Sequence, residues 1–202
     1  MQKTSLSICS AILALTCIGA SAQSRNAMSG MYIEADYTQA NVKINQDASA
    51  GVTADTKVKP SMYKFIVGAE VHPNLAIEGM LASGGSDNST TMNVNGTPTN
   101  TSMKINSAYG VYLKPKFNVT NDLELFGRIG YNRFNLTGVQ NYTSGGIAYT
   151  DTLKGNGNSV AYGIGVKYNI TREWSAVVDY MQYLKKDDTT INGLSFGLAY
   201  NF

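Results

Sequence analysis

The sequence predicts an all-β fold, an eight-stranded antiparallel up-and-down transmembrane β-barrel with short periplasmic turns and long extracellular loops. Apolar and polar residues alternate with a period of two over eight segments of strand length. The connections between these segments alternate between tight turns and long polar stretches. No run of 18 apolar residues is present after the N-terminal leader, which excludes helical membrane spans.

The leader comprises residues 1–22 and is typical of a cleaved signal peptide. Lys3 supplies the positive charge, residues 8–18 are almost entirely apolar, and Ala20-Ser21-Ala22 forms an A-x-A cleavage site before Gln23. A lipoprotein with Cys17 as its acylated residue is the alternative, but Leu15-Thr16 and the better site at Ala22 argue against it. We therefore expect one domain, a β-barrel spanning residues 23–202.

The composition of the mature chain excludes several classes of site. Both cysteines, Cys9 and Cys17, lie in the leader, so neither disulfides nor thiolate metal sites are expected. Without Lys3, 15 Lys and Arg residues face 14 Asp and Glu residues. Such a balanced charge gives no indication of a nucleic-acid partner.

The lengths of the connections predict the topology. Tight connections are expected at 72–74, 119–122 and 171–173, and long polar connections at 41–60, 83–103 and 135–158, with a shorter one at 185–192. In an up-and-down barrel, all the tight turns then lie at one end and all the long loops at the other. The long segments, such as Ser86–Ser102, are rich in Ser, Thr, Asn and Gly, and we interpret them as solvated loops without regular structure.

The polar face of the strands is predicted to line the interior of the barrel. A soluble lipocalin-like barrel is the alternative, in which the apolar face points inward. The polar face, however, combines many glycines with long charged side chains, as the narrow lumen of an eight-stranded barrel requires. Because buried charges must be paired, we expect lumen ion pairs among Glu34, Asp36, Glu70, Glu78, Glu124 and Asp179 and the bases Lys64, Lys114, Lys116, Arg128 and Lys167.

Aromatic residues on the apolar face gather at two predicted heights. Those toward the loop end are Tyr37, Tyr63, Tyr109, Tyr131, Tyr162 and Tyr180, and those toward the turn end are Phe117, Tyr168, Trp174, Tyr200 and Phe202. Amphipathic rings favour the two membrane–water boundaries. This pattern predicts aromatic girdles around an apolar face that meets lipid.

Four stretches of the chain resemble a known family. They are Val67–Glu70, Asn74–Gly79, Leu125–Tyr131 and Tyr162–Val166. They are similar to the outer-membrane β-barrel domain family of outer-membrane protein A, outer-membrane protein X and the opacity proteins. The resemblance covers the barrel alone, without the peptidoglycan-binding domain of outer-membrane protein A.

The resemblance implies a bacterial outer-membrane location, with lipid and lipopolysaccharide as surroundings. Phe196, Tyr200 and Phe202 resemble the terminal signal that the barrel-assembly machinery reads in this family. A further extracellular partner would contact the loops, and neither its identity nor the oligomeric state follows from the sequence.

Residues that could carry catalysis are few. His72 is the only histidine and lies in a predicted tight turn at the periplasmic end, so we interpret it as a turn residue and expect no enzyme and no cofactor. Calcium at Asp87 or Asp187-Asp188 would lack EF-hand spacing, and we expect no metal site. Two functions remain, a structural or surface-interaction barrel with a closed lumen, and a small or gated channel.

We predict that the mature protein begins at Gln23 and fractionates with the outer membrane, because the A-x-A site directs cleavage after export. N-terminal sequencing of the protein from isolated outer membranes checks both points. Retention of Met1, or a soluble periplasmic product, would contradict this expectation.

Overall fold

The computed structural model describes residues 30–44, 56–86, 88–94, 97–144, 147–186 and 189–202. The predicted leader, residues 1–22, lies outside them. The described residues form strands β1 (Met31–Ile44), β2 (Thr56–Val58), β3 (Ser61–His72), β4 (Leu75–Gly84), β5 (Asn88–Val94), β6 (Thr97–Asn118), β7 (Leu123–Ser144), β8 (Ile147–Asn169), β9 (Trp174–Lys186) and β10 (Thr189–Asn201). Within these ranges, no helix is long and apolar enough to cross a membrane.

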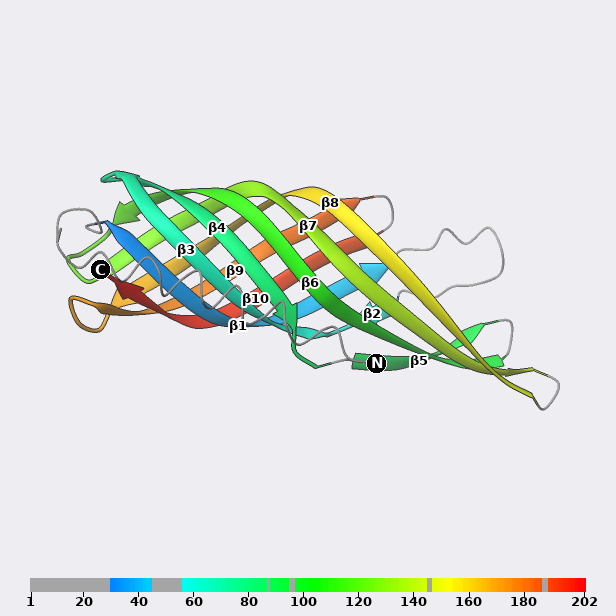
Figure 1. Cartoon of the computed structure of the whole chain (residues 1–202). Helices are drawn as coiled ribbons and strands as arrows, with labels where there is room; N and C mark the ends of the chain where they lie inside the picture. Colours follow the sequence, from blue (N-terminus) through cyan, green and yellow to red (C-terminus); the bar gives the residue numbers. More distant parts are fainter. Residues whose placement is uncertain (1–29, 45–55, 87, 95–96, 145–146, 187–188) are drawn as a thin grey trace, which may run out of the picture.

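Eight of the strands form a closed antiparallel ring. In order around the ring they are β1, β3, β4, β6, β7, β8, β9 and β10, and β10 pairs with β1 from Tyr32↔Asn201 to Ile44↔Thr189. Figure 1 shows the strands running obliquely around the barrel. Closure leaves no unpaired edge around the ring, which a bilayer requires of a sheet. The predicted eight-stranded up-and-down barrel is confirmed.

The two ends of the barrel differ, as the sequence predicts. Tight turns join β3 to β4, β6 to β7 and β8 to β9, and they gather at the end that also holds the C-terminus (Figure 1). We call this the turn end. The opposite end carries strands that continue beyond the ring, and we call it the hairpin end.

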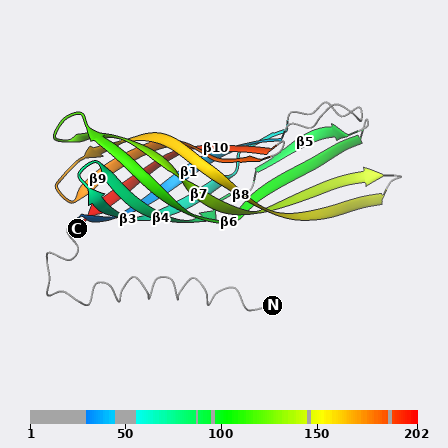
Figure 2. The same ribbon diagram turned by 90° about the horizontal axis from the view of Figure 1, so that it is seen from above.

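Two of the predicted long connections, 83–103 and 135–158, contain paired strands, so the interpretation of these two as loops without regular structure is wrong. β7 continues to Ser144 and pairs with β8 from Ile147 onward, while β5 and the start of β6 form a second hairpin over most of Ser86–Ser102. Figure 2 shows both hairpins projecting from the hairpin end. The sequence pattern could not reveal these hairpins. Outside the lipid, paired strands keep their backbone hydrogen bonds without needing one apolar and one polar face, so regular alternation is lost.

The two faces of the ring have opposite chemistry, and glycines let the inner face close. Outward residues are mostly large and apolar, such as Leu125 and Ile164, whereas inward positions hold charged side chains and glycines. A Cβ added at Gly165 would lie 2.3 Å from Cζ of Phe126, which itself points inward. Outward-facing Gly79 has nothing within 4 Å of such an atom.

Because the two glycines differ in this way, the same substitution to valine should have a large effect on stability at Gly165 and a small one at Gly79. Gly165→Val should destabilise the barrel by ~1–3 kcal/mol, because the added methyls displace Phe126 in a filled lumen. Gly79→Val should change the free energy of unfolding by less than ~0.5 kcal/mol, since its side chain enters open space. Urea unfolding of both refolded variants measures the difference, and equal destabilisation would contradict the assigned faces.

Candidate functional site

The guanidinium of Arg128 lies at the centre of the lumen and contacts carboxylates from three other strands. Its Nε donates to Oε2 of Glu78 at 2.6 Å, and its Nη2 donates to both oxygens of Glu34 at 2.8 Å. Nη1 donates to Oδ2 of Asp179. The fork of Arg128 on β7 therefore connects β1, β4 and β9, and all four side chains are buried.

Further ion pairs extend from this centre in both directions along the lumen. Toward the hairpin end, Nζ of Lys64 lies 2.7 Å from Asp179 and 3.2 Å from Asp36. Toward the turn end, Nζ of Lys114 lies 3.9 Å from Glu78 and 3.3 Å from Glu124.

The chain of pairs ends near the turn-end mouth. Lys116 Nζ lies 3.4 Å from Glu124 and also pairs with Glu70. Of the six acids expected to form lumen ion pairs, Glu34, Glu78 and Asp179 contact Arg128 directly. The other three, Asp36, Glu70 and Glu124, pair with lysines. The charges thus form one continuous series of alternating sign.

Lys167 differs from the other inward bases. Its ammonium donates to Oδ1 of Asn201 at 2.7 Å and lies 5.3 Å from the ring centroid of Tyr32. Within the described residues, no carboxylate lies within 4.0 Å of it. The structure therefore does not bring Lys167 into an ion pair, although it faces a polar cavity of about 310 Å³ at the turn end.

An apolar plug fills the hairpin end of the lumen, and sequence reasoning missed it. Phe134 and Tyr183 pack edge to face with ring centroids 5.8 Å apart, and further buried residues surround them. These include Val42, Met62, Ile66, Ile105, Met181 and Ile191. The available signal was the change on the inner face of β1, from Glu34 and Asp36 to Ala40 and Val42.

The three carboxylates of Glu34, Asp36 and Asp179 could in principle hold a metal ion, because one oxygen from each lies within 4.8 Å of the others. Lys64 and Arg128 already contact these groups. Two cationic side chains at this place oppose a divalent ion. The candidate calcium ligands Asp87, Asp187 and Asp188 lie outside the described residues.

The aromatic residues named from the sequence lie on the outer wall. Tyr37 packs against Tyr63 with ring centroids 5.7 Å apart, and Trp174 packs against Tyr200 at 5.2 Å. Tyr200 also contacts Phe202, whose backbone N–H donates to Met31 at 3.0 Å. The other outward rings, Tyr109, Tyr131, Tyr162, Tyr180 and Phe196, are each about half exposed.

His72 is exposed at the end of β3, in the turn that the sequence indicates. Its Nδ1 accepts a hydrogen bond from the backbone N–H of Asn74 at 3.3 Å. Among the described residues, no hydrogen bond or ion pair joins it to a serine or an acid. Its role here is to close a turn.

The closed ring, apolar outer wall and charged interior define an integral membrane β-barrel. Residues 10–202 match the family described as outer membrane protein beta-barrel domain. The chain belongs to this family, and its location is the bacterial outer membrane. With this orientation, the turn end is periplasmic and the hairpin end extracellular.

Solved structures of similar fold are outer-membrane barrels. Ail, the attachment invasion locus protein of Yersinia pestis, solved in complex with the heparin analogue sucrose octasulfate, is 18% identical over 87% of this chain and 100% of its own, with a TM-score of 0.55. Neisserial surface protein A is 15% identical over 86% and 98% of the two chains, with a TM-score of 0.51. OprG of Pseudomonas aeruginosa is 12% identical over 87% and 97%, with a TM-score of 0.50. No curated protein matched the sequence.

The position of Arg128 predicts a large effect of its removal. Arg128→Met should destabilise the barrel by ~3–5 kcal/mol, because Glu34, Glu78 and Asp179 would lose the cation that they share. Leu125→Ala on the lipid face is the control, with an expected cost of ~1–2 kcal/mol. Urea unfolding gives both values.

Planar-bilayer conductance of the same Arg128→Met variant distinguishes a plug from a pore. A plug predicts lost stability and a wild-type barrel that stays closed. Changed conductance with unchanged stability would show instead that these charges line an ion path.

Proposed function

We propose that this protein is a surface-interaction barrel with a closed lumen, and that it binds an extended segment of another protein along the extracellular edge of β8. The observation that carries the proposal is this edge. β9 pairs with β8 only between Tyr162↔Gln182 and Asn169↔Ser175, whereas β7 pairs with β8 out to Ser144↔Ile147. In the described structure, the backbone from Ile147 to Asn156 therefore pairs with β7 alone, whereas Ser159 still accepts a hydrogen bond from the backbone N–H of Lys185 on β9.

A long unpaired edge is a binding surface for backbone. Its N–H and C=O groups accept a further strand, which is how many proteins recognise extended peptides. Proteins commonly block such edges with several lysines, prolines or bulges. Between Ile147 and Val160 there is one lysine, Lys154, and no proline.

Apolar side chains on one face of this edge supply contact area for a partner. Ile147, Tyr149 and Leu153 lie on one face, with Asp151 between the last two, and are 60%, 43% and 63% exposed. In register with Leu153 lie Gly138 on β7 and Met103 on β6, and Met103 packs against the apolar plug of the lumen. Met103, Gly138 and Leu153 thus form one registered row from the apolar plug to the β8 edge.

The filled lumen favours binding over conduction. The ion-pair series occupies the middle of the barrel and the apolar plug its extracellular end. Eight strands leave room for little beyond these side chains. We accordingly propose a closed barrel, and a binding rather than an enzymatic function.

The remaining partners are proposed on chemical grounds. The outward aromatic residues suit the two interfaces of the membrane, with lipid and lipopolysaccharide around the wall. The C-terminal Phe202, with Tyr200 and Phe196, suits recognition by the barrel-assembly machinery. Ail was solved with a heparin analogue, which supports a ligand-binding role for a barrel of this type.

Substitutions on the β8 edge test the proposal. The double variant Tyr149→Lys and Leu153→Lys should weaken peptide binding about tenfold or more, because it removes apolar contact area and adds edge charge. The probe is an array of nine-residue peptides of alternating pattern, including a copy of residues 136–144, all of which pair with β8 in the chain. Binding is measured on the refolded barrel in detergent.

Asn141→Lys on the internal strand β7 is the matched control and should bind as the wild type does. Hydrogen exchange locates the bound peptide, with protection expected in residues 147–160. Equal binding by the double variant, or protection elsewhere, would refute the proposed edge.

A further inference from the structure

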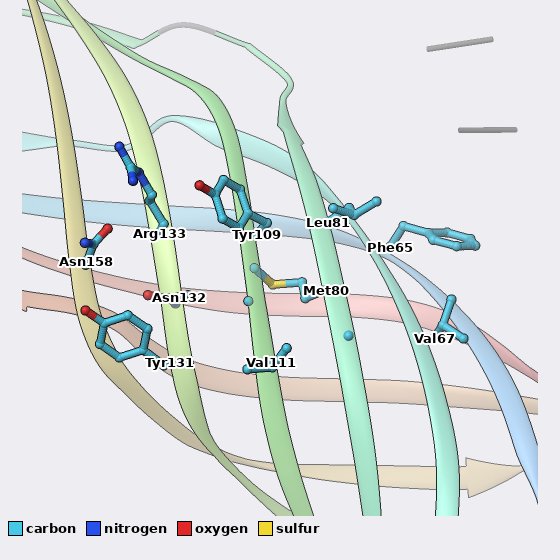
Figure 3. A pocket seen from close by; sticks show the side chains of 12 residues that line it. Phe65, Val67, Met80, Leu81, Tyr109, Val111, Tyr131, Asn132, Arg133 and Asn158 are labelled. Carbon is cyan, nitrogen blue, oxygen red and sulfur yellow. The ribbon is translucent and has the colours of Figure 1, made fainter. Parts of the chain in front are cut away.

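A groove crosses the lipid-facing wall of the barrel over β3, β4, β6 and β7. Two registered rows of outward residues line it, one being Val67↔Gly79↔Val111↔Tyr131 and the next Phe65↔Leu81↔Tyr109↔Arg133. Figure 3 shows Phe65 and Val67 at one end of the groove and Arg133 and Asn158 at the other. The groove is therefore apolar along most of its length and polar at one end.

The groove exists because Gly79 leaves its floor open. Nothing lies within 4 Å of the position that a Cβ at Gly79 would occupy, while Leu81 and Val111 on either side are 58% and 63% exposed. The volume of the groove is about 640 Å³. A cavity of this size with apolar walls, opening to the bilayer, suits a hydrocarbon chain.

Arg133 marks the end of the groove that faces the extracellular boundary. It lies two residues beyond Tyr131 on β7, or roughly 7 Å along the strand. Within the described residues, no carboxylate lies within 4.0 Å of its guanidinium, in contrast to fully paired Arg128. A half-buried arginine at headgroup height offers its planar donor fork to a phosphate.

The same outward face carries further positive charge. Lys104 and Lys154 stand on either side of Thr137 in one registered row, four residues beyond Arg133. Beyond Tyr109, Tyr131 and Tyr162, the described outward positions of β6, β7 and β8 hold these three cations and no acid. The charge of this face is complementary to an anionic headgroup layer.

We propose that the groove is a specific site for one phosphate-bearing, multi-acyl lipid of the outer leaflet. One acyl chain lies over Gly79 between Leu81 and Val111, and a headgroup phosphate accepts hydrogen bonds from Arg133. Lys154, on the same outward face, attracts the remaining headgroup charge. This site is separate from the β8 edge, and its lipid would bind whether or not the edge has a partner.

Native mass spectrometry of the refolded barrel in zwitterionic micelles tests the site, with lipid A as the probe and dephosphorylated lipid A for comparison. The wild type should retain one lipid A and bind the dephosphorylated form about tenfold more weakly, the effect of one lost charge-assisted contact. Arg133→Gln should remove this preference for phosphate. Gly79→Leu should weaken both lipids alike, because it fills the chain site.

Arg172→Gln, a change at an exposed arginine in the periplasmic turn, is the charge-matched control and should behave as the wild type. All variants must show the heat-modifiable gel migration of a folded barrel, and Gly79→Ala replaces Gly79→Leu if the larger side chain prevents folding. Soluble glucose 1-phosphate should not compete, since it lacks the chain. Equal retention of both lipids by the wild type, an unchanged preference in Arg133→Gln, or competition by the soluble phosphate would each overturn the proposal.

Discussion

A guanidinium buried between carboxylates from three other strands is the constraint on which this barrel depends. Arg128 cannot lose its charge, so the lumen around it must supply acceptors wherever it points. Glu34, Glu78 and Asp179 do so from β1, β4 and β9, and each therefore faces the barrel axis at the same height as Arg128. A slip of one residue in any of these strands would turn its acid toward lipid and leave the guanidinium short of a partner. The ion pairs thus specify register as well as fill space.

The interior of the barrel is filled by its own side chains, whereas the exterior carries the surfaces that can bind other molecules. Lysines and acids continue the pairing to the periplasmic mouth, and Phe134, Tyr183 and their neighbours fill the extracellular end. Glycines such as Gly165 make room for this filling where rings approach the wall. Because side chains occupy the interior, groups that can contact other molecules lie mainly on the outside of the barrel. The two surfaces proposed to bind other molecules, the β8 edge and the Arg133 groove, both lie there.

The β8 edge arises from the unequal lengths of the strands, and the groove arises from a glycine on the outer wall. β6, β7 and β8 are far longer than a bilayer crossing needs, so they leave the ring and expose an edge. Gly79 faces outward, where no packing demands a small residue, and it leaves a depression between larger neighbours. Arg133 then stands at the end of this depression where apolar wall meets headgroups. Lipid and protein partners would meet the barrel on adjoining but separate surfaces.

Period-two alternation in the sequence indicated the strands, because a strand places alternate side chains on opposite faces. The glycines and charges of the polar face assigned Glu78, Arg128 and the other charges to the interior, and the lengths of the connections indicated the three tight turns. These patterns could not determine that Arg128 meets Glu34 and Asp179, since contact across a lumen depends on the stagger of strands distant in sequence. Alternation also did not reveal the β7–β8 hairpin, because Ser, Thr, Asn and Gly interrupt its apolar positions while the backbone ladder continues. Only the tertiary structure decided these points, because hydrogen bonds between strands and contacts across the axis leave no periodic trace in one chain.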